Sequence, residues 1–184
     1  SYYDTNIGTH NVVYTDIENT DNYDHIYQSD LCGWVGQLGY NKDSIYGANV
    51  FTAEGNENLK AASFYATGKD SQYELYVVRQ FEDETSLEKM IPVASGKLGN
   101  AGYYTVDFNQ GIEVDAGERY AVVLYIITPG SVHPMAIEYA ADEATENVDL
   151  DDGESYISAN GSKWVSVDTV EKSNLCIKAF SDNR

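Results

Sequence analysis

The chain has few basic residues, few prolines and no long hydrophobic run. Its 184 residues include 11 Lys and Arg against 30 Asp and Glu, which gives a formal net charge of −19. A field of this sign repels nucleic-acid phosphates and anionic lipid surfaces, so neither nucleic acid nor membrane is expected as a partner. The acidity fits an extracellular protein or one that takes up divalent cations, and a surface that is acidic only for solubility is an equal alternative.

Cysteine is scarce as well, because only Cys32 and Cys176 occur. One pair does not define a disulfide framework, so the two can form a bridge or remain buried thiols, and we favour thiols. The sequence has neither an apolar run long enough to cross a bilayer nor a basic and apolar leader. It begins at Ser1 without an initiator methionine, which suggests an excised fragment.

Short segments rich in β-branched and aromatic residues alternate with turn residues along the chain. Residues 47–53 and 59–67 flank a polar hinge and have the pattern of paired antiparallel strands. Residues 119–127 form the most hydrophobic run and should be buried on both faces. Asn160 and Gly161 predict a tight hairpin. About ten such strands predict an all-β fold, a two-sheet antiparallel β-sandwich of jelly-roll type.

Carboxylates gather in two places where a hard cation could bind. Residues 16–24 contain four acidic side chains, and the hinge at 54–58 adds further oxygen ligands. Calcium takes about six to eight oxygens, and we select Asp21, Asp24 and Glu57 as its best ligands. The spacing is not that of an EF-hand. An acidic linker and a solvated turn are the simpler explanations.

Aromatic residues near glycines are candidates for stacking against sugar rings. We select four of them as possible ligand contacts, although burial in the core is the more common role of such rings. They are Trp34, Tyr40, Tyr46 and Trp164.

The sequence gives no specific sign of catalysis. Cys32-Gly33-Trp34 is similar to the surroundings of a cysteine-peptidase nucleophile, but it lacks the second cysteine and a helix that would lower the thiol pKa. His10, His25 and His133 are scattered without a metal-binding spacing. Carboxylate pairs are too numerous to indicate a glycosidase. We therefore expect no enzyme activity in this chain.

An ordered set of short motifs resembles a known family. The set resembles the lectin-like domain that follows the papain-like peptidase domain in secreted and cell-wall proteins of clostridia and related bacteria. The motifs lie in residues 20–28, 47–53, 63–65, 102–107, 154–158 and 176–180. Tyr2-Tyr3-Asp4 is similar to the end of such a peptidase domain. The resemblance implies a tail at residues 1–18, a lectin-like sandwich at 19–184, a jelly-roll-like fold, bound calcium as an option, and an ancillary role beside a peptidase.

Three functions follow as hypotheses. The first is a calcium-stabilised module that binds carbohydrate or cell wall and holds a peptidase outside the cell. The second is a structural spacer that packs on the peptidase domain and binds no glycan, since a fold alone does not give a function. A glycosidase is the remote third alternative.

Overall fold

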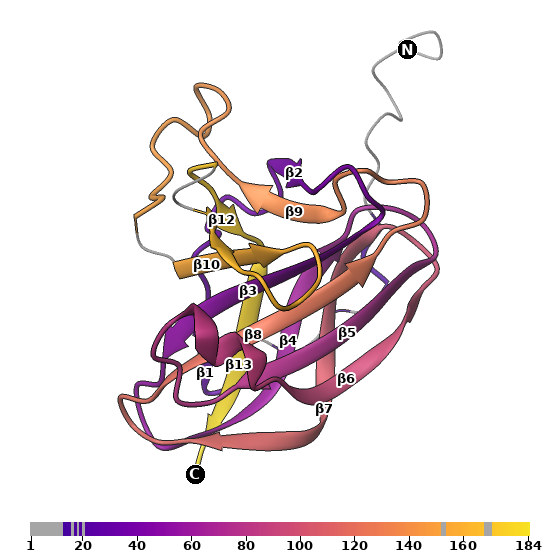
Figure 1. Ribbon diagram of the computed structural model, residues 1–184. Coiled ribbons are helices and arrows are strands. Elements are labelled where there is room, and N and C mark those ends of the chain that lie inside the picture. Colours follow the sequence, from indigo (N-terminus) through magenta and orange to yellow (C-terminus); the bar gives the residue numbers. More distant parts are fainter. Residues whose placement is uncertain (1–12, 16, 18, 20, 152–153, 168–170) are drawn as a thin grey trace, which may run out of the picture.

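The structure is a computed structural model that describes residues 13–15, 17, 19, 21–151, 154–167 and 171–184. Its described strands form three antiparallel sheets (Figure 1). The four-stranded sheet has the order β1 (His25–Tyr27), β13 (Ile177–Asn183), β4 (Glu57–Ala66), β7 (Gly102–Val114). The six-stranded sheet has the order β11 (Val165–Ser166), β10 (Glu154–Ser158), β3 (Ser44–Thr52), β8 (Arg119–Ile127), β5 (Ser71–Val78), β6 (Ile91–Leu98).

The third sheet is small and has the order β12 (Asn174–Leu175), β9 (Met135–Glu138), β2 (Gly36–Leu38). It packs close to β3, because a Cβ at Gly47 would lie 2.6 Å from Met135 Cε. A 3-10 helix, η1 (Glu84–Glu88), follows β5, and Asp83 caps it by accepting a hydrogen bond from Thr85 N. In the described part of the chain, no helix is long and apolar enough to span a bilayer.

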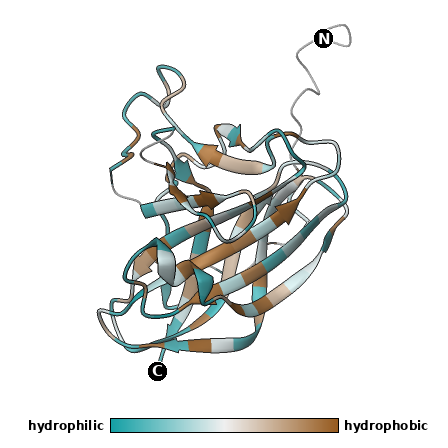
Figure 2. Ribbon diagram, viewed as in Figure 1, coloured by the Kyte–Doolittle hydropathy of each residue, from teal (hydrophilic) through white to brown (hydrophobic). Residues whose placement is uncertain are grey.

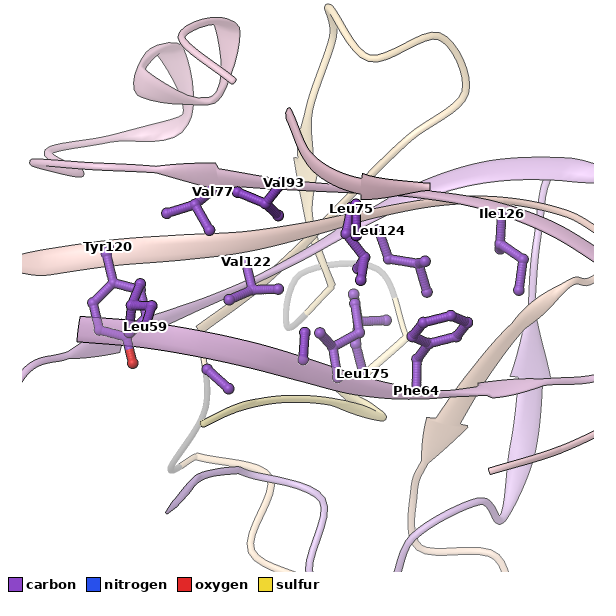
Figure 3. Close-up of a cluster of buried hydrophobic side chains, with 14 of the residues drawn as sticks. Leu59, Phe64, Leu75, Val77, Val93, Tyr120, Val122, Leu124, Ile126 and Leu175 are labelled. Carbon is purple, nitrogen blue, oxygen red and sulfur yellow. The ribbon is translucent and has the colours of Figure 1, made fainter. Parts of the chain in front are cut away.

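The main core lies between the two larger sheets, which confirms the predicted antiparallel β-sandwich. Phe64 of β4 faces Leu75 of β5 and Leu124 of β8, and all three are at most 1% exposed (Figure 3). Each such side chain stabilises the fold by about 1.5–3 kcal/mol relative to an exposed position. Apolar residues are concentrated on the central strands, and the connecting loops are mostly hydrophilic (Figure 2).

Alternation along β5 shows how the sequence produces this layer. Leu75 and Val77 are fully buried and belong to the core, whereas Glu74 is exposed and Tyr76 is half-buried on the opposite face. Successive side chains of a strand point to opposite faces, so the six-stranded sheet has an inner apolar side and an outer mixed side. The outer side carries the candidate site.

The predicted pairing of residues 47–53 with residues 59–67 is wrong. Both segments form strands, but β3 belongs to the six-stranded sheet and β4 to the four-stranded sheet. Ala53 and the residues that follow it carry the chain across the sandwich, and Ala53 N donates to Glu118 O rather than to β4. Each strand buries its apolar side in the shared core from a different layer.

Other predicted features occur in the structure with differences in length or exposure. The motif at residues 102–107 is part of a longer strand, β7, which continues to Val114. The hairpin around Gly161 is real, but its strands pair as Tyr156 with Ser166, so the loop is longer than a two-residue turn. Neither cysteine is paired, yet Cys32 is exposed and only Cys176 is buried. Most of the predicted 1–18 tail lies outside the described residues.

Candidate ligand-binding face

One row of side chains crosses the outer side of the six-stranded sheet. Strand register places Ser95, Glu74, Tyr125, Tyr46 and Ser158 opposite one another in five neighbouring strands. Directly opposed residues of antiparallel strands point to the same face, so these five side chains line up on the outer surface. We call the part of this surface formed by Tyr46, Glu74, Tyr76, Ser95 and Tyr125 the tyrosine face.

Two rings of the tyrosine face are stacked. The ring centroids of Tyr46 and Tyr125 are 4.2 Å apart, with an angle of 21° between the rings. Trp164 meets Tyr46 edge-on at 6.2 Å, and a Cβ at Gly161 would lie 3.1 Å from Tyr46 Cζ. Both rings are half-buried, and Tyr125 is the one of the two that lines a surface depression, with Tyr46 supporting it from one side.

A shallow depression lies beside Tyr125. It has a volume of about 390 Å³. Its lining consists of Gln72, Tyr73, Glu74, Ser95, Gly96, Lys97, Tyr125 and Ile127. A second depression of about 300 Å³ adjoins it, and the two share Glu74 and Ser95. A half-exposed ring bordered by amide, hydroxyl and carboxylate groups suits a ligand that has both an apolar face and polar substituents.

Hydrogen bonding fixes the carboxylate of this face. The Tyr76 hydroxyl donates to Glu74 Oε2. Burial raises the pKa of Tyr76, and the bond to Glu74 raises it further, so the phenol stays protonated at physiological pH. Burial also raises the pKa of Tyr46, with smaller contributions from Tyr125 and Glu74. The face thus presents one carboxylate that the protonated Tyr76 phenol holds in place.

The far half of the same surface is covered and apolar. Leu87 of η1 and Phe81 pack there against Ala121 and Val123 of β8. The Arg119 guanidinium lies 5.0 Å from the centre of the Phe81 ring. Residues at this end of the sheet are therefore a second, small core, and the accessible part of the outer surface is the tyrosine face.

The structure separates the four aromatic residues that the sequence predicted as ligand contacts. Tyr46 and Trp164 come together at the tyrosine face. Trp34 is 37% exposed and contacts Tyr65 of the other large sheet, with ring centroids 5.7 Å apart. Tyr40 is 36% exposed in the bend between β2 and β3. Within the described residues, no ring contact joins Trp34 or Tyr40 to the tyrosine face.

The structure places the three predicted calcium ligands in different surroundings. Both carboxylate oxygens of Glu57 accept protein hydrogen bonds: Oε1 from Tyr27 Oη at 2.7 Å and from Gly55 N at 2.8 Å, and Oε2 from Ser181 Oγ. Asp24 Oδ2 accepts two bonds from Asn183. Asp21 is exposed in the turn before β1. Across the part of the chain that the structure describes, no three His, Cys, Asp or Glu residues form a metal-binding group.

A separate buried polar cluster stabilises the end of the third sheet. Asp30 is fully buried, and its Oδ1 lies 3.0 Å from Lys178 Nζ. Glu138 is also fully buried, and it accepts hydrogen bonds from Asn174 Nδ2 and from Cys32 N. Burial raises the pKa of Asp30, and Lys178 offsets part of that rise. The Lys178 ion pair and the hydrogen bonds to Glu138 thus join β13, β12 and β9 to the segment before β2.

Sequence reasoning missed Tyr125, Glu74 and Ser95. Tyr125 lies within the run expected to be buried on both faces, but it is half-exposed because β8 covers the core with only one side at that position. A usable signal was present in residues 72–76, where Gln72, Glu74 and Tyr76 alternate with buried neighbours. Such alternation marks a strand whose outer side meets solvent.

The fold and the surface define a class: a two-layer antiparallel β-sandwich with an aromatic outer face. The lectin-like domain family matches residues 26–181, so the chain belongs to that family. No curated protein matches the chain.

Two solved structures from clostridia are similar. The cysteine protease Cwp84 after propeptide cleavage is 25% identical with a TM-score of 0.72, over 87% of this chain and 40% of that one. The structure of the cysteine protease and lectin-like domains of Cwp84, a surface layer associated protein of Clostridium difficile, is 21% identical with a TM-score of 0.67, over 87% and 36%. This chain therefore spans about two fifths of the protease chains that it matches.

Proposed function

We propose that this chain is a non-catalytic ancillary domain of a secreted or cell-surface cysteine peptidase, and that it binds carbohydrate of the cell wall through the tyrosine face. The family and the two similar clostridial protease structures support the ancillary role. The extracellular location is supported by the surface-layer association of one neighbour and by the acidic composition.

The observation that carries the binding role is the position of Tyr125. Its ring is half-exposed, is stacked on Tyr46, and borders a depression whose edge has polar groups. A pyranose has an apolar face and a rim of hydroxyl groups, so it matches a ring flanked by hydrogen-bonding side chains. Tyr46 holds Tyr125 in place, which lowers the ordering cost of binding.

A pull-down on purified cell wall, followed by a glycan array, tests this function with three proteins. Wild type should bind saturably, and Tyr125→Ala should bind about tenfold more weakly, which corresponds to ~1.4 kcal/mol. Tyr103→Ala is the matched control, because Tyr103 is a 45% exposed tyrosine on β7 of the four-stranded sheet. Absence of glycan binding by the wild type would leave the spacer hypothesis in its place.

Calcium stays a prediction from the sequence and the family resemblance. Its binding has to be measured on the whole domain, because Glu57 and Asp24 already accept hydrogen bonds from protein groups. A ligand selective for the native state raises the melting midpoint in proportion to the logarithm of its concentration. Melting scans in calcium and in chelator, with glycan binding measured in both, decide whether the ion takes part.

A further inference from the structure

The two depressions of the tyrosine face share one acidic residue, Glu74, which is exposed. Within the described residues, no Lys or Arg pairs with it. Lys97 is the one basic residue of the lining, and its ammonium group lies 3.4 Å from a carboxylate oxygen of Asp70 rather than beside Glu74. The acid of the site is therefore available to a ligand.

The acceptor character of Glu74 restricts what it can bind. An ionised carboxylate only accepts hydrogen bonds, and Tyr76 already donates to Oε2. The other oxygen has no donor among the described residues, so it can accept from a hydroxyl or an ammonium group of a ligand. A carboxylate or phosphate of an acidic polysaccharide would instead meet like charge at short range.

The overall charge favours a cation over a neutral donor. Tyr76 meets Glu74 through its hydroxyl, and Tyr125 lies opposite Glu74 in the pairing of β5 and β8, so the carboxylate and an aromatic ring border the same depression. The net charge of −19 adds a long-range field that concentrates cations and disfavours anions near the surface. The local acid and the overall field thus have the same preference.

We infer that the tyrosine face selects sugars with an unsubstituted amino group, as in de-N-acetylated hexosamine polymers. The ammonium group binds Glu74 and the pyranose ring lies against Tyr125. This inference rests on the proposed carbohydrate-binding function and names its ligand class.

Calorimetric titration with two oligosaccharides of equal length tests the inference. The probes are a glucosamine tetramer and an N-acetylglucosamine tetramer at pH 6, where the free amine is protonated. Wild type should bind the glucosamine tetramer at least about tenfold more tightly. Glu74→Gln should abolish that preference, and Tyr125→Ala should weaken binding of both probes.

Glu143→Gln is the matched control for net charge. Glu143 is exposed in the segment between β9 and β10, and its substitution by glutamine removes one negative charge, as Glu74→Gln does. It should leave the preference unchanged. A preference that survives in Glu74→Gln, or that falls equally in both variants, would overturn the role of Glu74.

Equal affinity of wild type for both tetramers, or tighter binding of the acetylated one, would overturn the amino-sugar preference and leave carbohydrate binding standing. Binding of neither tetramer, combined with binding of other glycans on the array, would also overturn it. Failure to bind any glycan would instead remove the proposed function itself.

Discussion

Ser155 and Asn49 lie on neighbouring strands of the six-stranded sheet, and the Ser155 hydroxyl donates a 2.7 Å hydrogen bond to Asn49 Oδ1. The Asn49 amide nitrogen in turn donates to the carbonyls of Leu175 and Ile177, each at 2.9 Å. Asn49 is 1% exposed. One buried amide thus joins the six-stranded sheet to the strands that end the chain.

Asn49→Ala should be much more destabilising than Ser155→Ala. The first change leaves two buried carbonyls without the donor they use, and each such group costs about 1–3 kcal/mol. The second change leaves one buried acceptor, Asn49 Oδ1, without its donor and removes a longer 3.4 Å bond from Leu175 N, so we expect about one such cost rather than two. Urea unfolding of the two variants measures the difference, and equal losses would show that Asn49 is not the central link.

The Glu57 carboxylate should make the fold less stable as the pH falls into the acidic range. Burial raises the pKa of Glu57, but hydrogen bonds from Ser181, Tyr27 and Gly55 outweigh burial, and the folded-state pKa lies below its usual value. A depressed carboxyl pKa stabilises the fold above the unfolded-state pKa of about 4.3, and the effect is lost as the pH falls through the folded value.

Glu57→Gln tests this pH dependence, because an amide can keep the bonds from Tyr27 and Gly55. Melting midpoints from pH 7 to pH 3 should fall less for the variant than for wild type. The difference should develop below about pH 4.5. Parallel curves for the two proteins would assign the acid sensitivity to other carboxylates.

Tyr120→Phe should be neutral or stabilising. Tyr120 is fully buried, and its hydroxyl has no hydrogen-bond partner among the described residues. Removing an unsatisfied buried hydroxyl relieves a desolvation cost, so we expect a gain of up to about 1 kcal/mol. Tyr27→Phe is the comparison, because the Tyr27 hydroxyl bonds Glu57 and Glu54 N, and its loss should destabilise. A loss in Tyr120→Phe as large as that in Tyr27→Phe would contradict the expectation.

Local patterns predicted the strands better than their partners. The segments at 47–53 and 59–67 and the apolar run at 119–127 all correspond to strands, because side-chain pattern and composition are properties of the segment itself. The assignment of β3 and β4 to different sheets depends on which distant strands cover them. That information is spread over the chain, so adjacency in sequence gave the wrong pairing.

The candidate site was less predictable for the same reason. Tyr46 and Trp164 were selected as single aromatic residues, but Tyr125 becomes accessible only through its place in the sheet register. Glu57 was selected as a metal ligand because it lies in the polar hinge at residues 54–58. Its actual partners, Tyr27 and Ser181, come from β1 and β13. Neither the exposure of Tyr125 nor the partners of Glu57 can be predicted from the residues next to them in the sequence.

Lys178 should be essential to the buried cluster with Asp30. Lys178→Met would leave the Asp30 carboxylate buried without its cation, and breaking such a pair costs about 3–5 kcal/mol. The double variant Lys178→Met with Asp30→Asn should recover much of the loss. Denaturant unfolding of the two single variants and the double variant gives the coupling, and strictly additive losses would exclude an interacting pair.

The two cysteines should differ in reactivity. Cys32 is exposed, whereas Cys176 is 2% exposed and burial raises its thiol pKa. Since the thiolate is the reactive form, an alkylating reagent should label one thiol per native chain and two in urea. Cys32→Ser should remove the native label and leave the second. Labelling that appears only after reduction would reveal a disulfide, and rapid labelling of both thiols in the native protein would show that Cys176 is accessible. In Cys32→Ser, the rate at which Cys176 is labelled reports how often the start of β13 opens to solvent. This rate should rise when Lys178→Met is added to Cys32→Ser, because the loss of Lys178 loosens the same cluster.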